Sequence, residues 1–476
     1  MRRARWPRPL LHYAPPRGFM NDPNGLIYHQ GRYHLFYQHN PHAPVWGHMS
    51  WGHAVGRSLL DWEDRPVALP EQPDYMIFSG SAVTDRANTA GFGVEALVAI
   101  YTAHYRDDRE AQSLAYSLDN GQQWTFFENN PVLIDPERPH VRDPQVFWYE
   151  PGGYWVMAVA RADDHQVAFY ASDDLKRWEL LSTFGPAGYW QEVPHWECPA
   201  LIELPVAGTD RTHWLLKVDV DDGAPAGGSG AQYFTGQFDG TRFVPDDPPD
   251  RVRWVEAGPD FYAAQAFNHL PDGRHVWLGW MNNWRYANAL PTHPWRGMLT
   301  VPRELALAEA NGHCYLVQRP CRDCYERMQL VDALPLGQPF PLPEAGLLRL
   351  RLRTNGRGTW HCCFFTGATR GVMLGYDAVN RLLFLDRREA GQTDFASDFP
   401  GCFQVPLPSN APDELELEIL FDRYSLEVFA PEVHLVLSVL VFPAPGDNSV
   451  WVYGKGCSLV EGICWRYATA RTDGAW

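Results

Sequence analysis

Residues 58–62 read Ser-Leu-Leu-Asp-Trp, and this short segment has three looser counterparts further along the chain. The counterparts are residues 117–124, 172–178 and 238–243, and each contains an aspartate and ends on Trp or Phe. The four closing aromatic residues are 62, 54 and 65 positions apart. Because units of this size can each hold four short strands, the period predicts the blades of a β-propeller.

A second set of residues keeps nearly the same period. It consists of Asp22, the Phe-Ser-Gly-Ser segment 78–81, Asp143, Glu197 and Asp260, at intervals of 57, 64, 54 and 63 residues. Five such openings predict five blades. If each lies on the innermost strand of its blade, side chains more than a hundred positions apart meet around one central funnel.

Three of these positions lie in short acidic motifs: Met-Asn-Asp-Pro-Asn-Gly at 20–25, Arg-Asp-Pro at 142–144 and Glu-Cys-Pro at 197–199. Asp-Pro and Asn-Gly are common turn dipeptides, so an isolated motif of this kind fits a structural turn. The turn interpretation explains the prolines but not the shared period. We therefore expect the three acids to form one site.

The composition of the chain favours an all-β fold and indicates that its ligand is uncharged. Short aromatic and β-branched runs alternate with Gly, Pro, Asn and Asp, and long amphipathic helices are not evident. The formal charge of -17 disfavours nucleic acid and anionic membrane surfaces as partners. The 20 Trp, 21 Tyr and 24 Phe suit both a β-rich core and contact with the faces of sugars.

The length of 476 residues indicates two domains. After a proline-rich stretch at 334–343, residues 347–354 and 414–419 alternate apolar and charged side chains, as in a sheet with one solvated face. We place the boundary near residue 330, with one domain over 1–330 and the other over 331–476.

No stretch approaches the roughly 18 consecutive apolar residues that span a bilayer. The first 16 residues carry basic side chains, but Trp and Pro interrupt them before an apolar run develops. We expect a soluble, cytoplasmic protein without a signal peptide, unless a trimmed N-terminus hides a secretory leader.

The nine cysteines lie mostly singly in strand-like segments, which is typical of a reduced protein. His313, Cys314, Cys321 and Cys324 raise the alternative of a zinc site. Structural zinc usually needs two paired ligand motifs, and residues 321–324 provide the only Cys-x-x-Cys of the sequence. Ordinary buried thiols explain these cysteines better, and we expect no metal or organic cofactor.

Taken together, the motifs resemble glycoside hydrolase family 32, the β-fructosidases. The resemblance covers nearly the whole chain and rests on the acidic motifs, residues 78–81 and 260–265, Gly-Trp-Met-Asn-Asn-Trp at 279–284, and the segments 295–305 and 421–429. Residues 216–234 are most similar to the levanase and exo-inulinase branch. The family implies a five-bladed propeller that carries the site, followed by a C-terminal β-sandwich.

The resemblance also implies roles for the acids. Asp22 corresponds to the nucleophile, Glu197 to the acid/base and Asp143 to the transition-state stabiliser, with Arg142 keeping Asp143 ionised. The reaction that the resemblance implies is hydrolysis of terminal β-D-fructosyl bonds in sucrose or fructans such as inulin and levan, with retention through a covalent fructosyl-enzyme. Expected substrate-binding residues are Asn21, Gln38, Trp46, Phe78, Ser79, Arg142 and Trp280.

Such a mechanism needs Asp22 ionised while Glu197 holds a proton. A charged Asp22 disfavours a second negative charge nearby, so proximity itself pushes the two pKa values apart. Asp260 has two interpretations, a sugar contact or a structural role such as fixing Tyr262. Two departures from the family pattern, Phe19 and Ala200, leave the outer pocket wall and the packing behind Glu197 open.

Two alternatives remain at this point. A fructosyltransferase would share the first half-reaction and use another sugar as acceptor. A propeller that had lost catalysis would bind fructans without cutting them. Sequence does not decide the preferred substrate, exo or endo attack, or the oligomeric state.

Overall fold

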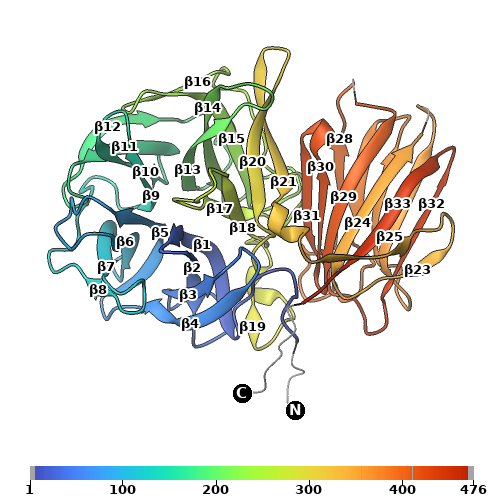
Figure 1. The fold of residues 1–476 in the computed structure, drawn as a ribbon, viewed down its shortest axis with the longest axis horizontal. Helices are drawn as coiled ribbons and strands as arrows, with labels where there is room; N and C mark the ends of the chain where they lie inside the picture. Colours follow the sequence, from blue (N-terminus) through green and yellow to red (C-terminus); the bar gives the residue numbers. More distant parts are fainter. Residues whose placement is uncertain (1–5, 355, 410, 470–476) are drawn as a thin grey trace.

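The computed structural model describes residues 6–354, 356–409 and 411–469, and these residues form an all-β fold. The helices in this part of the chain are three single 3-10 turns: η1 (Ala287–Ala289), η2 (Arg322–Cys324) and η3 (Pro431–Val433). None of the described helices is long and apolar enough to cross a membrane. Five sheets make a propeller, and two more make a sandwich beside it (Figure 1).

The first three blades follow one another along the chain. The first contains β1 (Gly18–His29), β2 (Arg32–Asn40), β3 (Ser50–Gly56) and β4 (Trp62–Leu69). The second contains β5 (Tyr75–Asp85), β6 (Ala96–Tyr105), β7 (Glu110–Ser117) and β8 (Thr125–Phe126). The third contains β9 (Val141–Tyr149), β10 (Tyr154–Arg161), β11 (Gln166–Ser172) and β12 (Glu179–Phe184).

The last two blades complete the ring. The fourth contains β13 (Trp196–Pro205), β14 (Thr212–Val220), β15 (Gly230–Phe238) and β16 (Phe243–Pro245). The fifth contains β17 (Tyr262–Ala266), β18 (Val276–Trp280), β20 (Arg303–Ala310) and β21 (His313–Pro320). Between β18 and β20, the short strand β19 (Trp295–Arg296) leaves the fifth blade and pairs in parallel with β1, which joins the last blade to the first.

The repeated segments of the sequence are the turns into the outermost strands of the first four blades. Three of them share one local design, in which the indole of the closing tryptophan donates to the carbonyl three residues earlier. Trp62 donates to Leu59 at 3.0 Å, Trp124 to Gly121 at 3.2 Å and Trp178 to Leu175 at 3.0 Å. The predicted five-bladed propeller is thus confirmed, and its period reflects these turns.

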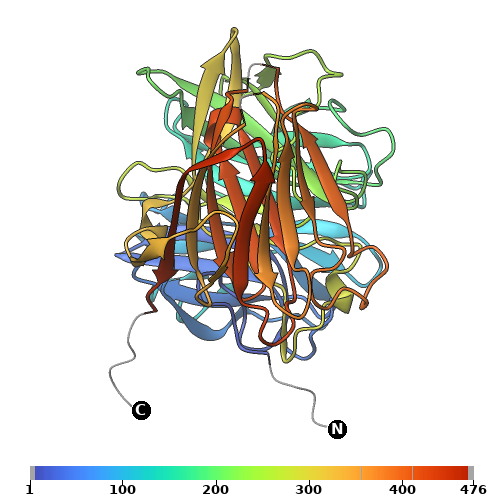
Figure 2. The ribbon, with the colours of Figure 1, turned by 90° about the vertical axis from the view of Figure 1, so that its right-hand side faces the viewer.

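The second group of strands forms a two-layered sandwich. The sheet nearer the propeller holds β22 (Met328–Ala333), β33 (Ser458–Tyr467), β24 (Gly346–Arg353), β29 (Glu414–Asp422), β30 (Ser425–Ala430) and β31 (Leu435–Leu440). The outer sheet holds β23 (Pro339–Pro341), β32 (Ser449–Lys455), β25 (Thr359–Thr366), β26 (Val372–Asp377), β27 (Leu382–Asp386) and β28 (Cys402–Pro406). Figure 2 shows the sandwich in front of the propeller. Residue 330, the predicted boundary, lies in β22.

Apolar and ionic contacts join the two parts. One hydrophobic cluster contains Leu35 and Tyr37 of the first blade together with Leu420 and Phe429 of the sandwich. Arg303 of β20 is fully buried and pairs with Glu427 of β30 at 2.5 Å. Because buried charges are costly unless paired, these contacts fix how the sandwich lies against the propeller.

Candidate active site

The inner strands of all five blades share an irregularity that shapes the site. Their pairing with the second strand slips at residues 20–23, 77–80, 142–145, 197–200 and 262–265, and the first blade has a further slip at residues 24–27. A bulge leaves a residue outside the ladder and re-aims its side chain. The first four slips contain Asn21, Asp22, Ser79, Asp143 and Cys198, so the bulges turn these side chains toward one another.

Backbone strain marks three of these bulges. Asp143, Cys198 and Ala263 have φ values of 64°, 49° and 53°, in the left-handed region that residues with a side chain rarely adopt. The Asp143 amide is held there by a 2.9 Å hydrogen bond to the hydroxyl of Thr102 in the second blade. Strained conformations persist where surrounding contacts enforce them, and they concentrate at functional sites.

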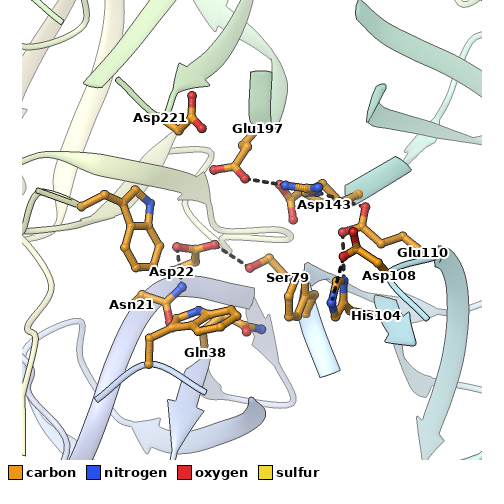
Figure 3. A pocket seen from close by; sticks show the side chains of 14 residues that line it. Asn21, Asp22, Gln38, Ser79, His104, Asp108, Glu110, Asp143, Glu197 and Asp221 are labelled. Carbon is orange, nitrogen blue, oxygen red and sulfur yellow. Dashed lines mark hydrogen bonds and ion pairs between the residues drawn. The ribbon is translucent and has the colours of Figure 1, made fainter. Parts of the chain in front are cut away.

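Asp22 is buried and accepts hydrogen bonds on both carboxylate oxygens. Ser79, from the neighbouring blade, donates to Oδ2 at 2.6 Å, and Asn21 donates to Oδ1 at 2.9 Å (Figure 3). Burial raises the pKa of Asp22 and the negative Glu197 adds to this, whereas the hydrogen bonds from Ser79 and Asn21 oppose it. Ser79 and Asn21 therefore favour the ionised form of Asp22.

Asp143 lies close to the other two acids. Its Oδ2 accepts from the Cys198 amide at 2.8 Å and from the Cys198 thiol at 3.4 Å. Burial raises the pKa of Asp143 well above its usual value, and the negative charges of Glu197 and Asp22 raise it further. Burial also raises the pKa of the Cys198 thiol, which therefore stays protonated and acts as a donor.

Glu197 is held by two donors from other parts of the ring. Arg142 donates from Nη1 to Oε1 at 2.8 Å, and the Tyr262 hydroxyl donates to Oε2 at 2.5 Å. Burial raises the pKa of Tyr262 well above that of an ordinary phenol, so this hydroxyl remains a donor. The Arg142 guanidinium also donates from Nε to Oε2 of the buried Glu110 at 3.0 Å.

Arg142 was expected to keep Asp143 ionised, and it acts on Asp143 by its charge rather than by a hydrogen bond between the two side chains. The hydrogen bonds of its guanidinium go to Glu110 and Glu197, and the positive charge lowers the pKa of Asp143 only through space. The reason is that Glu110, on β7, and Glu197, on β13, lie on either side of the arginine.

A cavity of about 440 Å³ opens over these acids. It is lined by Asn21, Asp22, Gln38, Trp46, Phe78, Ser79, His104, Asp108, Glu110, Arg142, Asp143, Glu197, Asp221 and Trp284. Nine of these side chains were predicted from the sequence. These nine residues come from four different blades. Residues that are distant in the sequence therefore meet at one cavity, as the matched period of the motifs predicted.

The predicted wall residue Trp280 does not line the cavity. It is fully buried behind Trp284, with ring centroids 4.6 Å apart, and Phe19 packs on it at 6.2 Å. The chain leaves β18 at Trp280 and turns, which brings Trp284 to the cavity surface instead. The other predicted aromatic residues do form a wall: Trp46 is 41% exposed and contacts Phe78, whose ring stacks on His104 at 4.3 Å.

The amide side chains offer groups suited to hydroxyl ligands. Asn21 Oδ1 is buried and has no hydrogen-bond partner among the described residues. The amide nitrogen of Gln38 donates to Asn24 and to the Ile77 carbonyl, both at 3.0 Å, which fixes the orientation of this side chain at the base of the cavity. An unsatisfied buried acceptor is costly, so Asn21 is prepared for a donor that a ligand brings.

Asp260 has a structural role rather than a place in the cavity. It is fully buried, accepts from the Tyr286 hydroxyl at 2.5 Å and pairs with Arg387 of the sandwich at 2.5 Å. Tyr262, which Asp260 was considered to fix, contacts Glu197 instead. Ala200 is fully buried in the core cluster that joins the fourth and fifth blades.

Sequence reasoning missed several groups of the site. Glu110, Cys198, Asp221, Tyr262 and Trp284 all contact the acids or line the cavity. Cys198 and Trp284 lie inside motifs already recognised, so their neighbours were the available signal. Glu110 follows an ordinary loop, and no pattern in the sequence distinguishes it.

The metal alternative is not supported at the predicted place. Cys321 directly precedes η2 and Cys324 ends it, and both are buried with their sulfur atoms 3.8 Å apart, whereas His313 and Cys314 lie on β21. Among the described residues, the cluster with metal-ligand spacing is a different one, His140, Asp163 and His195. It lies at the rim of the funnel, where its neighbours Asp108 and Asp221 line the cavity.

A propeller funnel with clustered carboxylates, an aromatic wall and hydroxyl-binding amides defines the class of the protein, a glycoside hydrolase. Comparison with known families narrows this class to a single family. The chain belongs to glycosyl hydrolases family 32: the N-terminal domain of that family matches residues 12–320, and its C-terminal domain matches residues 345–462.

Individual relatives agree with this assignment. The chain is 39% identical to a levanase of Bacillus subtilis (strain 168) over 94% of its own length and 68% of that protein. It is 38% identical to an extracellular exo-inulinase of Aspergillus awamori, over 92% of this chain and 90% of the relative. The crystal structure of an Aspergillus awamori exo-inulinase superimposes with a TM-score of 0.91 at 35% identity, covering 97% of this chain and 98% of that one.

A structure with a bound sugar is also similar. The β-fructofuranosidase of Schwanniomyces occidentalis, complexed with fructosyl-erythritol, superimposes with a TM-score of 0.87 at 29% identity. The match covers 97% of this chain and 98% of that one.

Proposed function

We propose that the protein is a retaining β-fructofuranosidase that hydrolyses terminal β-D-fructosyl bonds in sucrose, in fructans such as inulin and levan, or in both. The observation that carries this proposal is the convergence of Asp22, Asp143 and Glu197 on one cavity, in a chain whose relatives are named levanase and exo-inulinase. The cavity of about 440 Å³ has room for a terminal sugar, and its groups are those that a hydroxyl-rich neutral ligand needs.

In the first half-reaction Asp22 attacks the anomeric carbon of the fructosyl group. The bond from this carbon to the leaving oxygen breaks, and Glu197 gives its proton to that oxygen. Asp22 is suited to attack because Ser79 and Asn21 stabilise its ionised form and orient both oxygens. The product is a fructosyl ester of Asp22.

Arg142 has a part in preparing the acid. Arg142 Nη1 donates a hydrogen bond to Oε1 of Glu197. If Oε1 is to carry the proton for the leaving group, this hydrogen bond must break. A fructosyl hydroxyl that accepts from Arg142 would release Oε1, while Tyr262 continues to hold Oε2. Binding of the substrate would thus free Oε1 of Glu197 to carry a proton.

In the second half-reaction Glu197 takes a proton from water, which attacks the ester and regenerates Asp22. Esterification removes the negative charge of Asp22, so a charged Glu197 is then less disfavoured. Asp143 accepts hydrogen bonds from fructosyl hydroxyls, and these strengthen as the ring flattens toward the oxocarbenium-like transition state.

Incubation with sucrose, inulin and levan tests the proposal, with product analysis by chromatography. We expect free fructose from at least one of the three, and an Asp22→Asn variant should lose at least about 10⁴-fold in kcat while retaining its circular dichroism spectrum. Binding without release of fructose would instead identify a non-catalytic propeller. Fructo-oligosaccharides as the main product from concentrated sucrose would identify a transferase.

A further inference from the structure

We propose that His140, Asp163 and His195 form a binding site for a divalent transition metal, Zn²⁺ in particular, at the rim of the funnel. The site is separate from the three acids, and the proposal does not depend on the identity of the sugar. It rests on the convergence of three ligand atoms and on the carboxylates that hold the two imidazole rings from behind.

The three side chains come from two neighbouring blades. His140 directly precedes β9, Asp163 lies in the turn between β10 and β11, and His195 directly precedes β13. His140 Nδ1 is 2.9 Å from Oδ2 of Asp163, and His195 Nε2 is 3.3 Å from Oδ1 of the same carboxylate. The three ligand atoms all lie within 4.8 Å of one another, so small movements would bring all of them into contact with one ion.

The far nitrogen of each ring faces a second carboxylate. His195 Nδ1 is 2.9 Å from Asp221, which also accepts from the His195 amide at 3.1 Å. His140 Nε2 is 3.4 Å from Asp108. A metal-bound histidine characteristically donates its other ring N–H to a carboxylate, which fixes the tautomer and directs the lone pair at the metal.

The donor set selects the kind of ion. Two imidazoles and one carboxylate suit Zn²⁺ and its transition-metal neighbours, whereas Ca²⁺ and Mg²⁺ prefer oxygen ligands. Three protein ligands leave a fourth position of a tetrahedral zinc site for water. The side chains of His140, Asp163 and His195 are 22%, 49% and 31% exposed, so an ion can reach them from solvent.

The place of the cluster gives the metal a structural effect. It would tie the third blade to the fourth at the segment that leads into Glu197, two residues after His195. Its supporting carboxylates, Asp108 and Asp221, both line the catalytic cavity. Without a metal, the same contacts are ordinary pairs between imidazole and carboxylate. A metal site and a set of such pairs are distinguished by whether one ion binds per chain.

Calorimetric titration of the full-length protein with Zn²⁺ after treatment with a chelator tests the site. We expect one ion per chain, with a rise in the thermal midpoint on addition of Zn²⁺. His140→Gln, Asp163→Asn and His195→Gln should each weaken binding at least about tenfold, and Asp221→Asn should weaken it by about 10- to 100-fold. His213→Gln is the matched control, because it removes another imidazole–carboxylate pair, with Asp246, and should leave binding unchanged.

Cobalt provides a second measurement that separates this site from the nine cysteines. Co²⁺ bound by imidazole and carboxylate should show visible d–d absorption without thiolate-to-cobalt charge transfer, and Asp163→Asn should remove the absorption. The proposal is overturned if Zn²⁺ does not bind in a 1:1 ratio, if binding survives the three ligand variants, or if the cobalt spectrum shows thiolate ligation.

Discussion

Ser79 of the second blade donates a 2.6 Å hydrogen bond to Asp22 of the first, so the site depends on contacts between blades. Asp143 and Glu197 repeat this relationship: Thr102 of the second blade holds the Asp143 amide, and Arg142 of the third blade holds Glu197. Each acid is therefore positioned by a neighbour that is distant in sequence. Closure of the ring is a precondition for the chemistry.

The acid/base role of Glu197 predicts different effects on different leaving groups. With sucrose, Glu197→Ala should lower kcat by about 10²- to 10⁴-fold, because the leaving oxygen needs a proton. With p-nitrophenyl β-D-fructofuranoside, whose leaving group needs little protonation, fructosylation should be nearly as fast as in the parent protein. Pre-steady-state release of nitrophenol measures this step, and an equal loss with both substrates would contradict the role.

Glu110 is expected to act through Arg142 as a positioning residue. Glu110→Gln keeps the shape of the side chain but removes the negative charge that Arg142 Nε contacts. The positive charge of the guanidinium is then less neutralised, and its position is held less firmly. We expect kcat/KM to fall about tenfold and the alkaline limb of its pH profile to move to lower pH.

The pH profile distinguishes this role from a loss of stability. Glu203→Gln is the control, because Glu203 lies on β13 with its side chain exposed. A uniform loss of activity at every pH in Glu110→Gln, together with a lower thermal midpoint, would indicate that Glu110 only stabilises the fold.

The buried pair of Asp260 and Arg387 should contribute strongly to stability. Asp260→Ala leaves the fully buried Arg387 without its carboxylate, and breaking such a pair costs about 3–5 kcal/mol in the free energy of unfolding. The adjacent Arg388 gives a matched control, because its side chain is 62% exposed, and Arg388→Ala, which removes the pair with Asp386, should cost only a small fraction of that free energy. Chemical denaturation measures both, and equal costs would contradict this assignment.

His12 predicts a pH dependence of stability. It is buried between Asp422 and Glu427, and although burial alone would lower its pKa, the hydrogen bonds to these carboxylates raise the pKa to about 9. Because the folded pKa exceeds the unfolded value of about 6.5, the stabilisation is fully present below that pH and is lost as the pH rises through about 9.

The size of this effect is roughly 3 kcal/mol, from 1.36 kcal/mol per pKa unit. Denaturation midpoints measured from pH 6 to 10 should fall in the parent protein and fall much less in His12→Gln. His48→Gln, which removes a mostly exposed imidazole, is the control and should keep the parent's dependence. A fall of the same size in His12→Gln and the parent would refute the role of His12.

Local patterns in the sequence determined the blades and the identity of the acids. The turn that ends on Trp62 recurs in the second and third blades because the same tight connection to the outer strand is encoded by a few adjacent residues. Asp22, Asp143 and Glu197 could be recognised because each lies in a short motif at the same point of its blade.

Only the tertiary structure decided which groups surround those acids. Trp280 and Trp284 lie four positions apart in one motif, and the path of the chain after β18 determines which of them faces the cavity. Arg142 pairs with Glu110 and Glu197, and Asp260 with Arg387, because a charged group takes the partners that the packing of distant segments brings within hydrogen-bond distance. Those distances are set by closure of the ring and by docking of the sandwich, so they cannot be predicted from neighbouring residues in the sequence.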